Sequence, residues 1–121
     1  MKPTLALRLA AVTGFLAVAL GAFGAHGLKA VFEANGQGAT WQTASHYHLA
    51  HAIVLLVLAT RGSVARRPFT LFGVGILIFS GSLYVLAITN VRWLGAITPV
   101  GGLCLLGGWL MLALTPTEKS T

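Results

Sequence analysis

Three of the four histidines in this chain fall within six positions, in the stretch HYHLAH at residues 46–51. Imidazole can ligate zinc, copper or haem iron, and it exchanges protons near neutral pH. The surrounding segment, TASHYHLAHAIVLLVLA, is otherwise apolar and is typical of a membrane helix. A titratable ring at membrane depth is costly unless it has a partner, so these histidines are the first candidates for a site.

Helical geometry divides the three rings. His48 and His51 are three positions apart and share a face, whereas His46 lies about 140° from His51 in projection. One helix therefore cannot direct all three at one metal ion. We expect His48 and His51 to point inward, and His46 to reach the headgroups or another subunit. His26 could complete a three-histidine set if the first two helices pack closely.

The elements that must position these residues follow from the composition. Of 121 residues, 56% are hydrophobic and only 8% are charged, whereas a soluble domain carries about 25% charged residues. The chain is therefore predicted to be an integral membrane protein whose main partner is the lipid bilayer. The net charge of +6 does not indicate nucleic-acid binding, because the cations flank the apolar segments. Cys104 is the only cysteine, which excludes an internal disulfide.

Four apolar stretches predict four transmembrane helices, at about residues 5–24, 41–59, 68–87 and 94–114. Each is close to the roughly 20 residues that cross a bilayer as a helix. The connections are short, which makes sequential helices antiparallel neighbours. The sequence therefore predicts an all-α protein in which residues 1–121 form one antiparallel bundle of four transmembrane helices.

The basic residues predict the orientation of that bundle. Six of them belong to the side that holds both termini and the second connection: Lys2, Arg8, Arg61, Arg66, Arg67 and Lys119. The other side has only Lys29 and Arg92. Lys and Arg concentrate on the cytoplasmic side, so both termini are predicted to be cytoplasmic in a multi-pass protein of the inner (plasma) membrane.

The first twenty-five residues also resemble a secretory signal, with Ala22-Phe23-Gly24 as a possible cleavage site. We expect this segment to be retained as the first span. Its removal would leave three spans and disturb the charge distribution.

Small residues predict where the helices approach one another. Helices in lipid pack through close backbone contact at small side chains. Stripes of such residues run along the first and fourth spans, and their glycines are Gly14, Gly21, Gly24, Gly101 and Gly108. We favour packing within the chain as their role, and an interface in a homo-oligomer is the alternative.

Polar residues of the spans gather in the predicted non-cytoplasmic half. With the second span starting at Trp41, His51 lies only about 15 Å along it. We expect a polar pocket that opens outward and is closed below by apolar inner halves. Its candidate ligand-binding residues are His26, His48, His51, Ser80, Ser82 and Tyr84. Neutral histidines that hydrogen-bond to Tyr84, the serines or backbone carbonyls are the structural alternative, which we favour over a metal or cofactor site and over proton handling.

These patterns predict a non-enzymatic membrane protein that self-associates or serves as an accessory subunit of a larger membrane complex. The alternative is a binding or transfer protein for a metal, haem or a small ligand, using His48, His51 and His26. An enzyme ranks third, because His48 or His51 would be its only candidate general base within a span. The sequence holds no HExxH or CxxC motif, and no catalytic residue is assigned.

Four segments resemble a known family: GAFGAHGL (21–28), WQTASHYHLAHA (41–52), FSGSLYVLAIT (79–89) and LGAITPVGGLCLLGGW (94–109). The chain resembles the YgdD-like family, also called domain of unknown function 423, over nearly its whole length. The resemblance implies a small four-span membrane protein without an established activity. The family's signature residues would correspond here to Gly24, His26, Gly27, Trp41, Tyr47, His48, His51, Ser80, Gly81, Tyr84, Pro99, Gly101, Gly102 and Trp109. His46 is outside that pattern.

Overall fold

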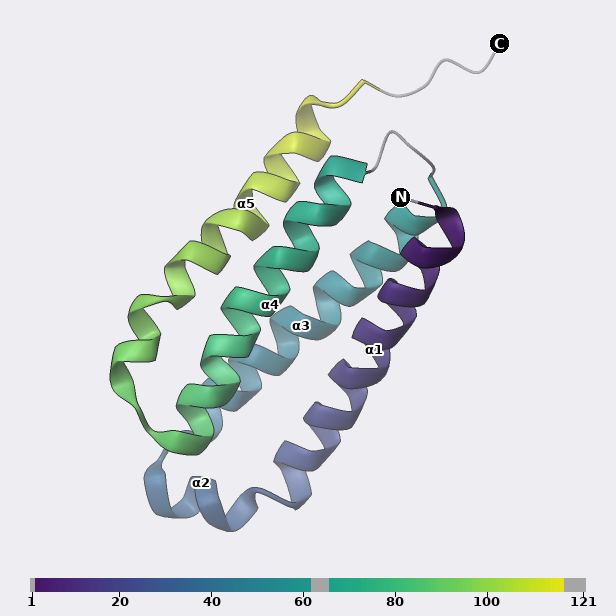
Figure 1. Ribbon diagram of the computed structural model, residues 1–121. Helices are drawn as coiled ribbons and strands as arrows, with labels where there is room; N and C mark the ends of the chain where they lie inside the picture. The colour runs from purple at the N-terminus through teal and green to yellow at the C-terminus, as the bar shows by residue number, and fades with distance from the viewer. Residues whose placement is uncertain (1, 62–65, 117–121) are drawn as a thin grey trace.

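The computed structural model describes residues 2–61 and 66–116, and within them it is helical without strands. The elements are α1 (Pro3–His26), α2 (Lys29–Asn35), α3 (Gly38–Ala59), α4 (Arg66–Thr89), the 3-10 helix η2 (Arg92–Ala96) and α5 (Thr98–Leu114). Figure 1 shows the long helices α1, α3, α4 and α5 side by side, with the start of α1 and the end of α5 at one end and α2 at the other. This arrangement places each of the four predicted apolar stretches largely within one helix.

Three helical segments of the described chain are long and apolar enough to cross a membrane: Pro3–His26, Arg66–Thr89 and Arg92–Leu114. α3 is not among them, although it has 22 residues. The histidine run spans its middle, and other polar side chains precede the run, which together lower its mean hydropathy.

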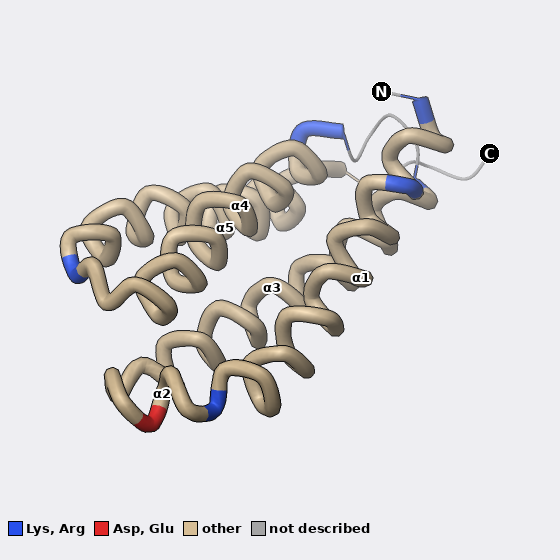
Figure 2. Tube along the Cα trace, turned by 60° about the horizontal axis from the view of Figure 1, so that its bottom comes forward, with Lys and Arg blue, Asp and Glu red and all other residues tan. Residues whose placement is uncertain are grey.

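The long helices form a row. α1 packs on α3, α3 on α4 and α4 on α5, and among the described residues these are the extensive contacts between long helices. Figure 2 shows the same order from another side, as an α1–α3 pair beside an α4–α5 pair. The two outer helices, α1 and α5, therefore each pack along one long neighbour.

The interior has two apolar clusters. The larger one is centred on the fully buried Phe72 of α4 and also contains Ala6, Ala10, Leu55, Leu58, Phe69, Ile76 and Leu105. It lies toward the end that holds the start of α1. The smaller one, Leu28, Trp41 and Ala87, lies at the α2 end. Burial of these side chains from α1, α3, α4 and α5 fixes which faces of the helices meet.

The predicted packing glycines do not all behave alike. A methyl group added at Gly101 would collide with the backbone of Phe79, and one added at Gly108 would lie 2.8 Å from the Phe72 ring. At Gly24 it would collide with the indole of Trp41, and at Gly21 it would lie 3.0 Å from the Ser45 hydroxyl. Gly14 differs, because a methyl group there would meet no atom within 4 Å. Gly14 therefore makes no close packing contact within the chain.

α2 closes one end of the row through specific polar contacts. Gly36 ends the helix in the left-handed conformation, with φ of 72°, which favours glycine because it has no side chain. The Asn35 amide then donates to the carbonyl of Ala87 at 2.8 Å, and the Gln37 amide donates to the side-chain oxygen of Asn90 at 2.8 Å. The connection after α1 is thereby attached to the end of α4.

Candidate functional site

His48 lies in the middle of α3 and is 5% exposed. Its Nδ1 is 2.8 Å from the hydroxyl of Tyr84 on α4. Its position beside Leu55 on one face of α3 turns it toward α1 and α4. The expected contact between a histidine of the run and Tyr84 is therefore present in the structure.

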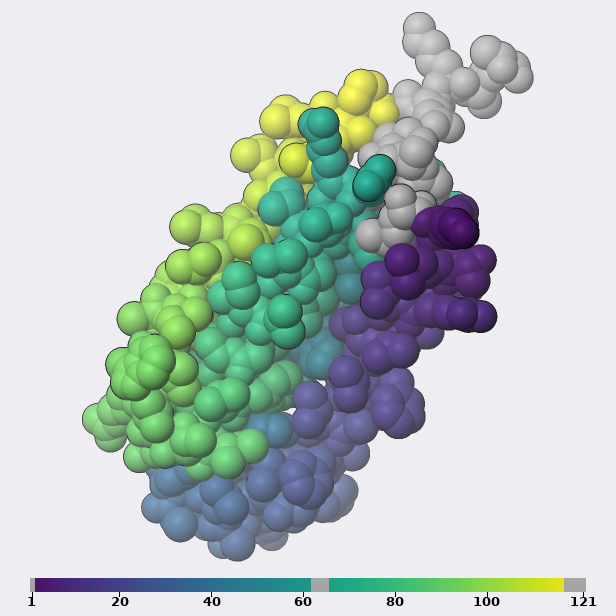
Figure 3. Space-filling view, in the orientation of Figure 1, coloured from purple at the N-terminus to yellow at the C-terminus, as the bar shows by residue number. Residues whose placement is uncertain are grey.

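His48 and Tyr84 lie at a groove between α1 and α4. The groove has a volume of about 470 Å³, and its walls include Leu9, Thr13, Leu16 and Leu20 of α1 and Phe69, Gly73, Leu77, Ser80 and Gly81 of α4. Figure 3 shows the hollow between the purple α1 and the teal α4, with blue α3 behind it. Methyl groups at Gly73 or Gly81 would meet no atom within 4 Å. The groove is therefore an apolar space with a few polar groups in its wall.

His51 has a different environment. Its Nδ1 lies 2.7 Å from the carbonyl of Tyr47, and its Nε2 accepts a hydrogen bond from the indole N–H of Trp109 on α5 at 3.1 Å. A carbonyl only accepts, so Nδ1 must carry the proton and Nε2 must be unprotonated. Both contacts thus require the neutral ring, and neither nitrogen is available to a metal ion. His51 joins α3 to α5 across the ring of Phe72.

The position of His51 corrects the predicted depth. α3 begins at Gly38 rather than Trp41, so His51 is about 20 Å along a helix of about 33 Å. It lies past the midpoint, toward the end that holds both the start of α1 and the end of α5. The polar contacts are thus not confined to the half of the bundle near α2.

The serines of α4 point to different neighbours. Ser80 is buried and donates to the carbonyl of Ala44 on α3 at 2.8 Å. The Ser82 hydroxyl lies 2.6 Å from that of Thr98 on α5. Ser80 therefore belongs to the groove side of α4, and Ser82 joins α4 to α5.

His26 is not brought to His48 and His51 as a ligand set. It is the last residue of α1 and is exposed. Within residues 2–61 and 66–116, no three His, Cys, Asp or Glu side chains are close enough together to hold a metal ion. The expected pocket is thus divided: His48, Ser80 and Tyr84 line the groove, while His51 and Ser82 bind to α5 or to the backbone.

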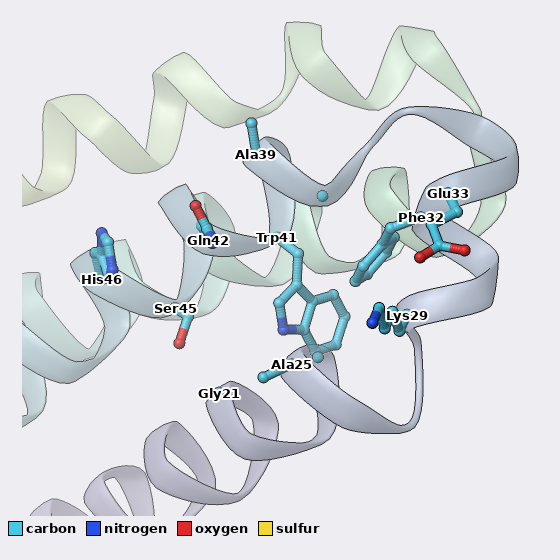
Figure 4. Close-up of a pocket in the computed structure, with 12 residues that line it drawn as sticks. Gly21, Ala25, Lys29, Phe32, Glu33, Ala39, Trp41, Gln42, Ser45 and His46 are labelled. Atoms are coloured by element: carbon cyan, nitrogen blue, oxygen red, sulfur yellow. The ribbon is translucent and has the colours of Figure 1, made fainter.

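A second cleft, of about 690 Å³, opens at the α2 end. Its lining comes from the end of α1, from α2 and from the start of α3, as Figure 4 shows. The polar residues in its wall are Lys29, Glu33, Gln42, Ser45 and His46. His46 faces this cleft, away from His48 and His51, which agrees with the helical phase predicted from the sequence.

Sequence reasoning missed two features of these sites. Trp109 lies in the otherwise apolar second half of the fourth span, and its indole N–H is a donor that needs an acceptor at membrane depth. That requirement was a usable signal, although it does not by itself identify His51 as the partner. Lys29 and Glu33 lie in the connection between the first two spans, and nothing in their spacing indicates a cleft.

Comparison with known proteins identifies relatives along most of the chain. The family described as "Protein of unknown function (DUF423)" matches residues 20–102. The UPF0382 membrane protein YwdK of Bacillus subtilis is 42% identical over 117 residues, covering 91% of this chain and 94% of the relative. The UPF0382 inner membrane protein YgdD of Escherichia coli is 40% identical over 114 residues, covering 88% and 84%. A UPF0382 membrane protein of Haemophilus influenzae is 42% identical over 112 residues, covering 88% and 89%.

These matches confirm the family resemblance. Together with the three apolar helices, they also confirm the predicted location in the inner (plasma) membrane. No solved structure matches the chain significantly.

Proposed function

The chain belongs to the DUF423 family, and from that premise we propose that it is a four-span, non-enzymatic membrane protein that works by associating with other membrane helices. The partner would be a second copy of the chain or the subunits of a larger membrane complex. Both termini would lie in the cytoplasm.

Chain connectivity supports α3 as the fourth span. α1 ends at the α2 end of the molecule, and α4 begins at the opposite end. If α1 and α4 both cross the bilayer, the chain between them must cross back, and α3 is the helix that does so. Its 22 residues reach about 33 Å, enough for the hydrocarbon core. Its polar side chains face α1, α4 and α5 or the membrane surface.

The charges support the orientation. The element bounds place Lys2, Arg8, Arg61, Arg66 and Arg67 at the end with the start of α1, and Lys29 and Arg92 at the other. Figure 2 shows Lys and Arg in blue near both ends of the molecule. Lys119 lies outside the described residues. Cations flanking membrane helices prefer the cytoplasm. In a Cys104→Ser background, an impermeant maleimide should label Gln37→Cys and not Arg61→Cys from outside intact cells. The reverse pattern would overturn the orientation, and labelling of both would overturn the crossing by α3.

The observation that carries the association proposal is the open side of α1. This helix packs along one long neighbour, and Gly14 has no close contact within the chain. Glycine on a membrane helix permits close approach of another helix backbone. Its neighbours Ala10 and Ala17 are buried against the rest of the chain, so Gly14 lies at the edge of the packed face, where a second chain has access.

Co-purification of two differently tagged copies from mixed expression tests this proposal. Gly14→Leu should abolish co-purification, whereas Ala19→Leu, on the far side of α1, should not. Both variants should retain the wild-type thermal midpoint, because neither position is packed within the chain. Unchanged co-purification of Gly14→Leu would exclude this contact between copies. If wild-type copies never co-purify, the self-association proposal is wrong. The proposal that the chain is a subunit of a larger complex is then tested by identifying the membrane proteins that co-purify with it in mild detergent.

A second candidate function is ligand binding at His48, and the groove between α1 and α4 favours it. Both ring nitrogens of His51 are hydrogen-bonded within the chain. The residues that would contact a ligand are therefore His48, Tyr84 and Ser80, which line the groove. The ligand would be elongated and apolar with one polar group, because the wall is mostly aliphatic. Mass spectrometry of the purified protein would identify a retained molecule, and an absorption spectrum and metal analysis would detect haem or metal. Loss of the bound species in His48→Ala but not in His46→Ala would support this function, and equal retention would exclude it.

A further inference from the structure

The cleft at the α2 end is a lipid-headgroup site: we propose that it binds a zwitterion made of a phosphate and an ammonium group, as in phosphatidylethanolamine. Its volume of about 690 Å³ exceeds that of the α1–α4 groove. It lies where α1 ends and α3 begins, which is the membrane surface if these helices cross the bilayer. The proposal depends on that placement and not on self-association.

The charged groups of the cleft define the class of ligand. Three charged residues lie at this end of the described chain, Lys29, Glu33 and Arg92, and the first two line the cleft. In Figure 4 the Lys29 ammonium lies on the side of Trp41 and Ala25, while the Glu33 carboxylate lies beside Phe32. A ligand with both charges can satisfy both groups. A purely anionic headgroup gains the contact with Lys29 but is repelled by Glu33.

Neutral polar groups line the α3 side. Gln42 lies one turn before the adjacent residues Ser45 and His46 near the start of α3, and all three contribute to the cleft. Their amide, hydroxyl and imidazole groups can donate hydrogen bonds to phosphate oxygens beside the Lys29 ammonium. This assignment agrees with the expectation that His46 reaches the headgroups and not the interior of the bundle.

The remaining wall suits the glycerol and first acyl carbons of a lipid. The indole of Trp41 is buried, donates to the carbonyl of Leu20 at 3.0 Å, and lies 5.6 Å from the Phe32 ring. On the α1 side, Gly21, Gly24 and Ala25 present almost no side chain. The cleft thus has a charged outer part and an apolar wall that continues toward the membrane interior.

Native mass spectrometry of the full chain, with defined lipids added, tests the proposal. The wild type should retain phosphatidylethanolamine over phosphatidylglycerol by about three- to tenfold, as expected for one added charge-assisted contact. Glu33→Gln should remove this preference by raising retention of phosphatidylglycerol and lowering that of phosphatidylethanolamine. Lys29→Gln should lower retention of both lipids. Arg92→Gln, at the same end but outside the cleft, is the matched control and should behave as wild type.

Competition with soluble O-phosphoethanolamine shows whether the cleft binds only a lipid headgroup or also the same zwitterion free in solution. Displacement of the lipid would assign the site to the free zwitterion as well, and no displacement would restrict it to the lipid. The proposal is overturned if the wild type shows no preference, if Glu33→Gln leaves the preference unchanged, or if Arg92→Gln removes it equally. Retention is counted per chain, so it should persist in Gly14→Leu whether or not copies associate.

Discussion

α4 carries glycines on two of its sides, and the surroundings of the two sides differ. Toward α5, a methyl group on Gly75 would lie 2.6 Å from the Leu105 side chain, and Gly101 of α5 lies against the backbone of Phe79. Toward α1, Gly73 and Gly81 have open space. The histidines of α3 follow the same division: His51 binds to Trp109 of α5, and His48 lies in the α1–α4 groove. Similar residue types thus close one seam and leave the other open.

This difference indicates separate roles for the two seams. In the α4–α5 seam, Gly75, Gly101 and Gly108 make close contacts and the Ser82 hydroxyl is hydrogen-bonded to Thr98, so substitution at these residues should cost stability. In the α1–α4 groove, glycines leave open space. Substitution of these glycines should therefore change what binds in the groove more than it changes the stability of the fold.

The largest effect is expected at Gly101. Gly101→Val would force Phe79 and α5 apart, because even a methyl group collides with the Phe79 backbone. The free energy of unfolding should fall by about 3 kcal/mol or more. Unfolding of the detergent-solubilised protein by SDS measures this. Gly73→Ala is the matched control on the open side and should remain within about 0.5 kcal/mol of wild type. Equal losses in both variants would remove the distinction between the seams.

His51→Ala should have the next largest effect. It removes a buried ring and leaves the Trp109 indole N–H without its acceptor, at an expected cost of about 2–3 kcal/mol. Trp109→Phe in the His51→Ala background should then cost little more, since the lost hydrogen bond is shared. A double-mutant cycle on the free energy of unfolding measures this coupling. Additive losses would show that the two side chains act independently.

Tyr84→Phe should have a smaller effect. It removes the hydroxyl beside Nδ1 of His48, and the expected cost is about 1 kcal/mol, the usual net contribution of one hydrogen bond. Tyr47→Phe is the control, since Tyr47 contributes its backbone carbonyl to His51 and its side chain is about half exposed. If Tyr84→Phe lowers the free energy of unfolding as much as His51→Ala does, the side of the molecule at the α1–α4 groove is packed as tightly as the side at α5.

Gly81→Leu should change stability least. Its side chain enters the groove and fills part of the 470 Å³, so the free energy of unfolding should stay within about 1 kcal/mol of wild type. Any molecule retained in the groove should be lost, which mass spectrometry of the purified variant would detect. Retention of the same molecule in Gly81→Leu would place it outside the groove.

The helical architecture was predictable because its determinants are local. Apolar stretches of near-span length and short connections identify the long helices and their antiparallel order. Stripes of small residues predicted Gly24, Gly101 and Gly108 as contact positions, and a methyl group added at any of them would lie less than 3 Å from a residue of a neighbouring helix. The sequence does not predict whether the two outer helices, α1 and α5, also pack against each other. That depends on which of several apolar helix faces meet.

The histidine environment was predictable only in part. Helical phase separated His46 from His48 and His51, and the polar residues of α4 indicated Tyr84 as a partner. The three-residue spacing places His48 and His51 on one face of α3, but it did not predict that His48 would contact α4 and His51 would contact α5. That outcome depends on the rotation of α3 between α1, α4 and α5, and on Trp109 reaching past Phe72. A helical projection of one element does not contain this information.

The attachment of Asn35 to Ala87 sets an order for membrane insertion. The two residues are 52 positions apart in sequence, so the amide of Asn35 leaves the ribosome well before its acceptor. Until α4 has entered the bilayer, the short helix after α1 lacks this hydrogen bond and has only its contacts with α1 and α3. Release of the nascent chain before residue 87 should therefore yield an α1–α3 hairpin whose surface-exposed turn is accessible to protease.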